Sequence, residues 1–199
     1  MSSRSYKQFC GLARALDVVG DRWNLLIVRN LIIGPLTWGE MRDHLPGIAK
    51  NLLSARLSQL ESDGVIVRRD GRYALTAHGR HLEPALFALA AWGETHGAFR
   101  ATSDEAIRLR YFMTSLKGRL RSQARTSRLC LDIDGELFAV TLGPAPTVET
   151  IAQPRHDGAP HRHRGPIIAI TFAELRAVVF ANAAPRQPRL VPLAKALAR

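Results

Sequence analysis

The chain has only two cysteines, Cys10 and Cys130, among its 199 residues. Two cysteines make neither a disulfide framework nor the ligand cluster of a zinc site. The first nine residues lack the apolar core of a signal peptide, and no apolar run reaches the roughly 18 residues of a membrane span. We therefore expect a soluble cytoplasmic protein with no membrane partner and no metal or cofactor.

Acidic residues are also scarce. The chain has 28 Lys and Arg against 17 Asp and Glu, a formal net charge of +11. Such a balance favours a polyanionic partner, with nucleic acid first and an acidic membrane surface second. The alternative is that the excess charge only keeps the protein soluble. Residues 1–100 carry 13 basic and 9 acidic residues (+4) and residues 101–199 carry 15 and 8 (+7), so most of the excess lies in the second half.

Enzyme signatures are missing as well. The sequence has no nucleophile elbow, Walker loop or dinucleotide fingerprint. We expect that the protein is not an enzyme. Its 46% hydrophobic content is enough for a real core. A change of pattern near residues 99–103 predicts two domains, 1–100 and 101–199, and an α+β fold class.

Helical spacing dominates the first domain. A helix is expected over 11–19, with a buried stripe of Leu12, Ala15, Leu16 and Val19, and a second helix with Asp21 as its cap. Thr37 and Glu40 form a capping-box pattern at the start of a short helix. A further helix is expected over 49–62.

A hairpin and a long helix follow. Residues 65–69 and 72–76 read as strands around an Asp70-Gly71 turn, and Thr76 is expected to cap one helix that runs to His96. The apolar surface of that helix exceeds what a small helical core can bury, so it predicts a homodimer; the alternative is packing against the second half of the chain. This surface consists of Leu82, Leu86, Phe87, Leu89, Trp92 and Gly93.

The order of these elements predicts a winged helix-turn-helix. The helix over 49–62 directs leucines to the core and small polar groups outward, which suits a helix that enters the major groove of double-stranded DNA. Arg56 flanks the core side of this helix, and the alternative to a DNA contact is that it pairs with an internal acid. For the arginines of the hairpin, the alternative is that they form a solvent-exposed rim and contact no DNA. The candidate DNA-binding residues are Thr37, Lys50, Asn51, Ser54, Ala55, Arg56, Ser58, Arg68, Arg69 and Arg72.

Several segments resemble the HxlR family, within the MarR-like winged-helix group. The segments are 10–23 (CGLARALDVVGDRW), 39–42, 46–48, 53–57, Leu60-Glu61 and 73–76. Together they cover about residues 10–97 in the family's order, although Gly11 stands where the family often has proline. The resemblance implies a transcriptional regulator that binds a two-fold operator as a homodimer and usually controls neighbouring genes.

The same resemblance directs attention to Cys10. Several HxlR-type regulators have a cysteine near the N-terminus that senses oxidants or electrophiles, and Cys10 stands at that position. Lys7 and Arg14 are near in sequence and favour a thiolate. The alternative is a small buried core residue.

The second domain is expected to be small and α+β. It begins with an amphipathic helix over 104–125 that carries a basic stripe of Lys117, Arg121, Arg125 and Arg128, either a solvated face or an extra phosphate contact. A hairpin around Asp134-Gly135 follows, and then a flexible loop over 144–166 whose His156, His161 and His163 lack the spacing of a metal site. A helix over 172–181 with Thr171 as cap and a last helix after Pro192 complete the chain.

This domain loosely resembles a reduced sterol-carrier-protein type 2 fold. The resemblance implies a pocket for an apolar small-molecule effector that changes DNA affinity, with a domain that only supports the dimer as the alternative. The rival function is a lipid- or small-molecule-binding protein whose winged helix mediates protein contacts. Residues expected to line the pocket are Phe112, Leu131, Phe138, Val140 and Phe172.

Overall fold

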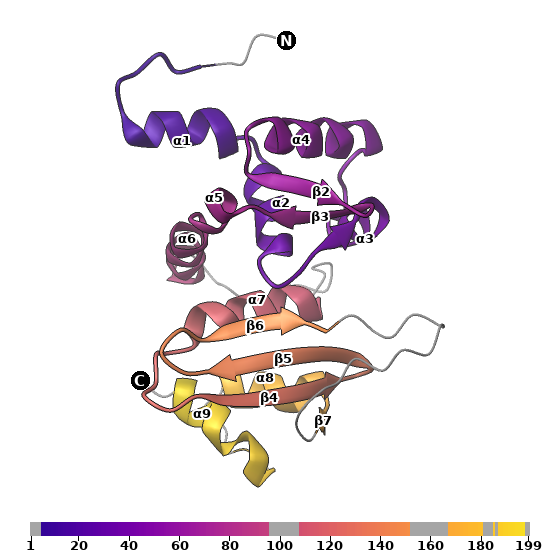
Figure 1. Cartoon of the computed structure of the whole chain (residues 1–199), viewed down its shortest axis with the longest axis vertical. Helices are drawn as coiled ribbons and strands as arrows, with labels where there is room; N and C mark the ends of the chain where they lie inside the picture. Colours follow the sequence, from indigo (N-terminus) through magenta and orange to yellow (C-terminus); the bar gives the residue numbers. More distant parts are fainter. Residues whose placement is uncertain (1–4, 96–107, 152–166, 181–184, 186, 198–199) are drawn as a thin grey trace. The chain divides into compact units, whose positions relative to one another are not determined.

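The structure is a computed structural model that describes residues 5–95, 108–151, 167–180, 185 and 187–197 (Figure 1). The chain divides into two compact units, unit 1 (Met1–Tyr111) and unit 2 (Phe112–Arg199). Among the described residues, no helix is long and apolar enough to cross a membrane.

The core of unit 1 is built from short helices. These are α1 (Gly11–Val19), α2 (Asn24–Leu31), α3 (Trp38–Asp43) and α4 (Lys50–Ser62). Leucines spaced three and four apart on α4 meet the apolar side of α2, as helical periodicity predicts. The largest fully buried side chains of this core are Ile27, Leu31, Ile32, Ile33, Met41, Leu45, Leu53, Leu57, Leu60 and Ile66.

A three-stranded sheet forms the wing. Strands β2 (Ile66–Arg69) and β3 (Arg72–Leu75) pair antiparallel around Asp70 and Gly71, whose φ angles of 49° and 75° fit a tight hairpin turn. The sequence patterns predicted this hairpin. They missed β1 (Leu36–Thr37), a two-residue strand that pairs with β3 and gives the order β1-β3-β2.

The expected single helix over 76–96 is wrong. Thr76 does cap a helix, by accepting a hydrogen bond from the Gly79 amide, but α5 (Ala77–Arg80) stops there and α6 (Glu83–Thr95) begins afresh. Pro84 explains the break, because a proline inside a helix removes one amide donor and clashes with the carbonyl four residues earlier. Near the start of α6 the same proline is tolerated.

The expected buried stripe of α1 is also wrong in part. The helix has the predicted bounds, but its Leu12, Ala15 and Leu16 are exposed, and only Ala13 and Val19 are buried. Asp21 is not a side-chain cap of α2, which begins after Trp23 without one. The Asp21 carboxylate instead forms an ion pair with Arg56.

Unit 2 is built around a mixed four-stranded sheet. The antiparallel strands β4 (Ser127–Ile133) and β5 (Glu136–Leu142) form the predicted hairpin, with β6 (Thr147–Thr150) beside β5 and β7 (Ile167–Ile170) parallel to β4. The order is β6-β5-β4-β7. Leu131, Phe138 and Val140 are fully buried on one face of this sheet.

Helices accompany this sheet. Helix α7 (Leu109–Arg119) starts at the end of unit 1 and continues into unit 2, and α8 (Phe172–Phe180) packs against α9 (Val191–Leu197), which follows a 3₁₀ turn at Pro188–Leu190. Thr171 caps α8 as expected, by accepting a hydrogen bond from the Glu174 amide, and the Thr171 amide in turn donates to the Glu174 carboxylate. Phe112 of α7 contacts Phe172 of α8 edge to face, with 5.0 Å between ring centroids.

Two expectations for unit 2 need correction. Helix α7 ends at Arg119, so Arg121 and Arg125 follow the helix and Arg128 lies in β4, and the four basic residues form no helical stripe. The chain leaves the helix because the Arg121 amide donates to Ala196 of α9 and the Gln123 amide donates to Gly143. The expected loop over 144–166 contains β6; its three histidines and residues 104–107 lie outside the described residues.

Candidate nucleic-acid interface

Helix α4 has one buried and one open side. Leu53, Leu57 and Leu60 are at most 1% exposed, whereas the opposite side carries the expected small and polar residues Lys50, Asn51, Ser54, Ala55 and Ser58, all exposed. No acidic residue lies in its first turn and Ala49 supplies no side-chain cap, so the positive end of the helix is uncompensated. This side is suited to an approach to a polyanion.

Helix α3 braces α4 from the side. The indole Nε1 of Trp38, the first residue of α3, donates to Ser54 Oγ over 3.1 Å. The Arg42 guanidinium lies 5.9 Å from the Trp38 ring centroid. This hydrogen bond from Trp38 positions the Ser54 side chain. The periodicity of the sequence did not predict the contact.

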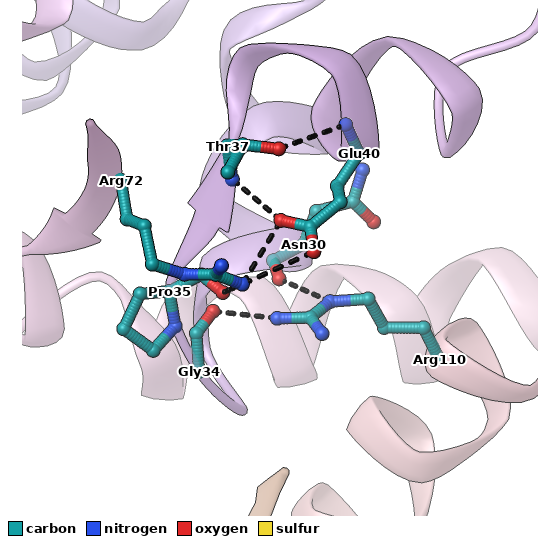
Figure 2. A network of polar contacts seen from close by, with 7 residues as sticks. All are labelled: Asn30, Gly34, Pro35, Thr37, Glu40, Arg72 and Arg110. Carbon is teal, nitrogen blue, oxygen red and sulfur yellow. Dashed lines mark hydrogen bonds and ion pairs between the residues drawn. The ribbon is translucent and has the colours of Figure 1, made fainter. Parts of the chain in front are cut away.

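The capping box at the start of α3 is confirmed. The Thr37 amide donates to Glu40 Oε2 over 2.6 Å, and the Glu40 amide donates to Thr37 Oγ1 over 3.3 Å. Burial acts to raise the pKa of Glu40, but the hydrogen bonds from Thr37 and the charge of Arg72 outweigh it and lower that pKa. Figure 2 shows this arrangement.

The three wing arginines differ in their surroundings. Arg68 and Arg69 are exposed, and the Arg68 guanidinium lies 5.5 Å from the ring centroid of Tyr73. Arg72 turns toward the body of unit 1, where its Nη2 donates to both carboxylate oxygens of Glu40 and to Pro35 O (Figure 2). Arg72 thus braces the wing against α3.

Arg56 is the other arginine with an internal partner. Its guanidinium forms an ion pair with Asp21, which lies just after α1. The internal acid that the sequence left open as an alternative is therefore present.

Two residues that the sequence patterns missed lie at the start of α7. Arg110 Nε donates to Asn30 O over 2.6 Å and its Nη2 to Gly34 O over 2.5 Å (Figure 2), and the Tyr111 hydroxyl donates to His44 O. The partners are 67 to 80 residues away in the chain. Local sequence patterns carry no information on such contacts.

His44 sits in a strongly basic environment. Its pKa is lowered to about 4, first by burial and then by the positive charges of Arg110, Arg108 and Arg29, against a smaller opposite effect of Asp43. Burial also lowers the pKa of Arg29, whose guanidinium lies 3.7 Å from the Tyr111 ring centroid. His44 is therefore neutral at physiological pH.

The remaining candidates belong neither to α4 nor to the wing. Cys10 is exposed at the residue before α1, and Cys130 is buried. In unit 2, Phe112 is buried and Phe172 half-buried, alongside the fully buried Leu131, Phe138 and Val140. Among the residues that the structure describes, no cluster of His, Cys, Asp or Glu has the makings of a metal site.

Comparison with known proteins gives matches that cover about half of the chain or less. A family model described as HxlR-like helix-turn-helix matches residues 18–100. The HTH-type transcriptional regulator YybR of Bacillus subtilis is 32% identical over 97 residues, which cover 45% of this chain and 78% of YybR. A regulator of the same type from Methanothermobacter thermautotrophicus is 31% identical over 103 residues, covering 48% of this chain and 79% of the relative.

Solved structures give a similar coverage. Quinone-bound YodB from B. subtilis is 32% identical, covers 41% of this chain and 93% of its own, and has a TM-score of 0.40. The structure of PA1607 is 41% identical, with 52% and 75% coverage and a TM-score of 0.43. The sequence relatives are transcriptional regulators, in agreement with the expectation that the chain is not an enzyme.

Proposed function

We propose that the chain, which belongs to the HxlR-like helix-turn-helix family of transcriptional regulators, binds a two-fold operator as a homodimer. The open side of α4 carries the proposal. It presents small and neutral polar side chains, so that the helix backbone can approach the edges of bases closely. A helix that is merely solvated is normally covered by long charged side chains.

We assign distinct roles to the candidate residues. Asn51, Ser54, Ala55 and Ser58 face the bases, Lys50 contacts phosphate at the start of α4, and Arg68 and Arg69 contact the backbone or the adjacent minor groove. Thr37, Arg56 and Arg72 support the interface through the cap and the two ion pairs. The expected operator contact then comes from α4 and the wing together.

The homodimer would use α1 and α6. Helix α6 has no buried residue, and its Leu89 and Trp92 are 50% and 57% exposed. Phe9, two residues before α1, and Leu12, in its first turn, are 103% and 68% exposed. Exposure of this much apolar surface to water costs free energy in a monomer. A second copy of the chain is always present in solution and can cover this surface.

We propose two routes of regulation. In the first, an apolar small molecule binds among the aromatic and aliphatic side chains of unit 2, in line with the resemblance to sterol-carrier-protein type 2. In the second, oxidation of Cys10 changes DNA affinity, a role supported by the exposure of this thiol. Cys10→Ser removes any response of DNA binding to diamide if the second route operates, and an unchanged response refutes it.

Selection of genomic fragments with the purified protein tests the proposal. We expect enrichment of one two-fold sequence, bound by two copies of the chain. Binding that is sensitive to salt but indifferent to sequence would instead favour the rival function, in which the winged helix mediates protein contacts.

A further inference from the structure

We infer that Arg110 and Tyr111 are positioning residues for DNA reading, although they lie outside the family match, which ends at residue 100. The inference rests on the proposed function and adds residues to its site. It concerns the two turns that fix α3 within the helix-turn-helix: the turn between α2 and β1, and the turn between α3 and α4.

Arg110 holds the first of these turns. It is 6% exposed, and its guanidinium donates to Asn30 O and Gly34 O, near the C-terminal end of α2 (Figure 2). Carbonyl oxygens at a helix C-terminus lack partners within the helix and form the negative end of its dipole. A buried arginine at this place donates hydrogen bonds to these carbonyls and puts a positive charge beside the negative end of the dipole. A lysine in its place keeps the charge but lacks the planar, fixed arrangement of guanidinium N–H donors.

Tyr111 holds the second turn. Its hydroxyl donates to the carbonyl of His44, the residue that ends α3 and starts the turn toward α4. The same carbonyl accepts a bond from Asn30 Nδ2 over 3.4 Å. Asn30 is fully buried, and its own carbonyl is the partner of Arg110. Together these hydrogen bonds form a closed network through Arg110, Asn30, His44 and Tyr111. The network connects the two turns to each other.

The opposite end of α3 is tied to the wing. Arg72 bonds Glu40 and also Pro35 O, in the same turn that Arg110 reaches through Gly34 (Figure 2). Helix α3 is therefore bonded to Arg72 of the wing at its start and to Tyr111 at its end. Helix α4 and the wing must contact the DNA at the same time. If the turn at His44 loses its hydrogen bonds, α4 is less precisely positioned relative to the wing, and contacts with bases weaken more than the attraction to phosphates.

Two conservative variants of the full chain test the inference. Tyr111→Phe keeps the ring over Arg29 and removes the hydroxyl, and Arg110→Lys keeps the charge. Binding is measured to the highest-affinity fragment from the selection and to a scrambled duplex of equal length. We expect each variant to lose roughly fivefold to thirtyfold in affinity for the selected fragment, the size of one or two hydrogen bonds, with the scrambled duplex and the salt slope unchanged.

The matched controls are Tyr6→Phe and Arg121→Lys, which alter exposed side chains of the same types. They should bind both DNAs as the wild type does. A purely structural role of Tyr111 would lower the melting temperature and leave affinity intact at a temperature where the chain is fully folded. The loss of selectivity should persist there, with shifted backbone amide resonances of α4 in the free Tyr111→Phe protein.

Two results would overturn the inference. One is an unchanged ratio between the two DNAs in both variants. The other is an equal loss on both DNAs, which would mean that Arg110 and Tyr111 affect general DNA affinity and not the reading of bases. If the wild type itself prefers neither DNA, the proposed function fails, and the α4 amide resonances decide the inference alone: shifted signals support it and unshifted ones refute it.

Discussion

The guanidinium of Arg72 lies 2.9 Å from a carboxylate oxygen of Glu40, so that one ion pair joins the wing to the first turn of α3. Glu40 is also half of the capping box with Thr37. Helix α3 and the wing belong to different segments of the chain, and this pair is one of the places where they are held together. The relationship leads to predictions for stability as well as for DNA binding.

Removal of the cap should destabilise the protein. Thr37→Ala loses the acceptor for the Glu40 amide, which typically costs about 1 kcal/mol of unfolding free energy. Urea unfolding measures the loss. Ser62→Ala, at the exposed end of α4, should change the unfolding free energy little. Equal stability of the two variants would argue against the cap.

The Glu40 contacts should also depend on pH. The pKa of Glu40 is lowered in the folded chain, so its contribution is present above the ordinary pKa of a glutamate and is lost as the pH falls through the lowered value. Glu40→Gln should therefore be less stable than the wild type at neutral pH, and the difference should shrink under acid conditions. A difference that stays constant on acidification contradicts this assignment.

His44 should make the folded chain sensitive to mild acid. Its pKa of about 4 lies below the ordinary value of 6.5, so between these values the unfolded chain binds more protons and stability falls as the pH is lowered. Above that window the effect is absent. His44→Gln should flatten the fall in urea-unfolding free energy, whereas His81→Gln, at an exposed position, serves as the control. An unchanged pH slope in His44→Gln would be evidence against the half-buried, neutral imidazole.

The wing arginines should act through phosphate contacts. Arg68→Ala and Arg69→Ala should each weaken binding to all DNA sequences and reduce the slope of log affinity against log salt by about 0.9 per lost contact. Arg80→Ala, which removes an arginine paired with Glu83 outside the wing, is the control. If the salt slopes of both variants equal that of the wild type, Arg68 and Arg69 are exposed to solvent and contact no phosphate.

The exposed face of α6 should mediate self-association. Trp92→Asp places a charge on this face and should shift the chain from dimer to monomer in sedimentation at micromolar concentration, with a corresponding loss of operator affinity. Ile167→Asp alters another exposed apolar residue, in unit 2, and should leave the dimer intact. A wild-type chain that is monomeric at this concentration refutes the homodimer.

Local signals predicted a large part of unit 1. The capping box at Thr37, the Asp70-Gly71 turn and the leucine spacing of α4 act over a few residues, so the sequence shows them directly. The broken helix at Pro84 also had a local signal, which the apolar stripe obscured. The hairpin of unit 2 was predicted in the same way.

Other features depend on contacts between distant segments. Leu12 and Leu16 have the spacing of a core face and are nevertheless exposed, because periodicity cannot tell a core from a subunit interface. The bonds of Arg110 and Tyr111 join residues 67 to 80 positions apart. Such contacts decide which arginines support the fold and which are free to meet DNA, a distinction that residue type alone does not make.

The most direct test repeats the fragment selection with an Asn51→Gln variant and compares the enriched sequence with that of the wild type. Asn51 is exposed in the first turn of α4, where contacts with base edges concentrate. We expect a changed base preference at one position in each half-site, related by the two-fold axis, with the rest of the operator unchanged. An identical enriched sequence would contradict the assignment of α4 as the reading helix.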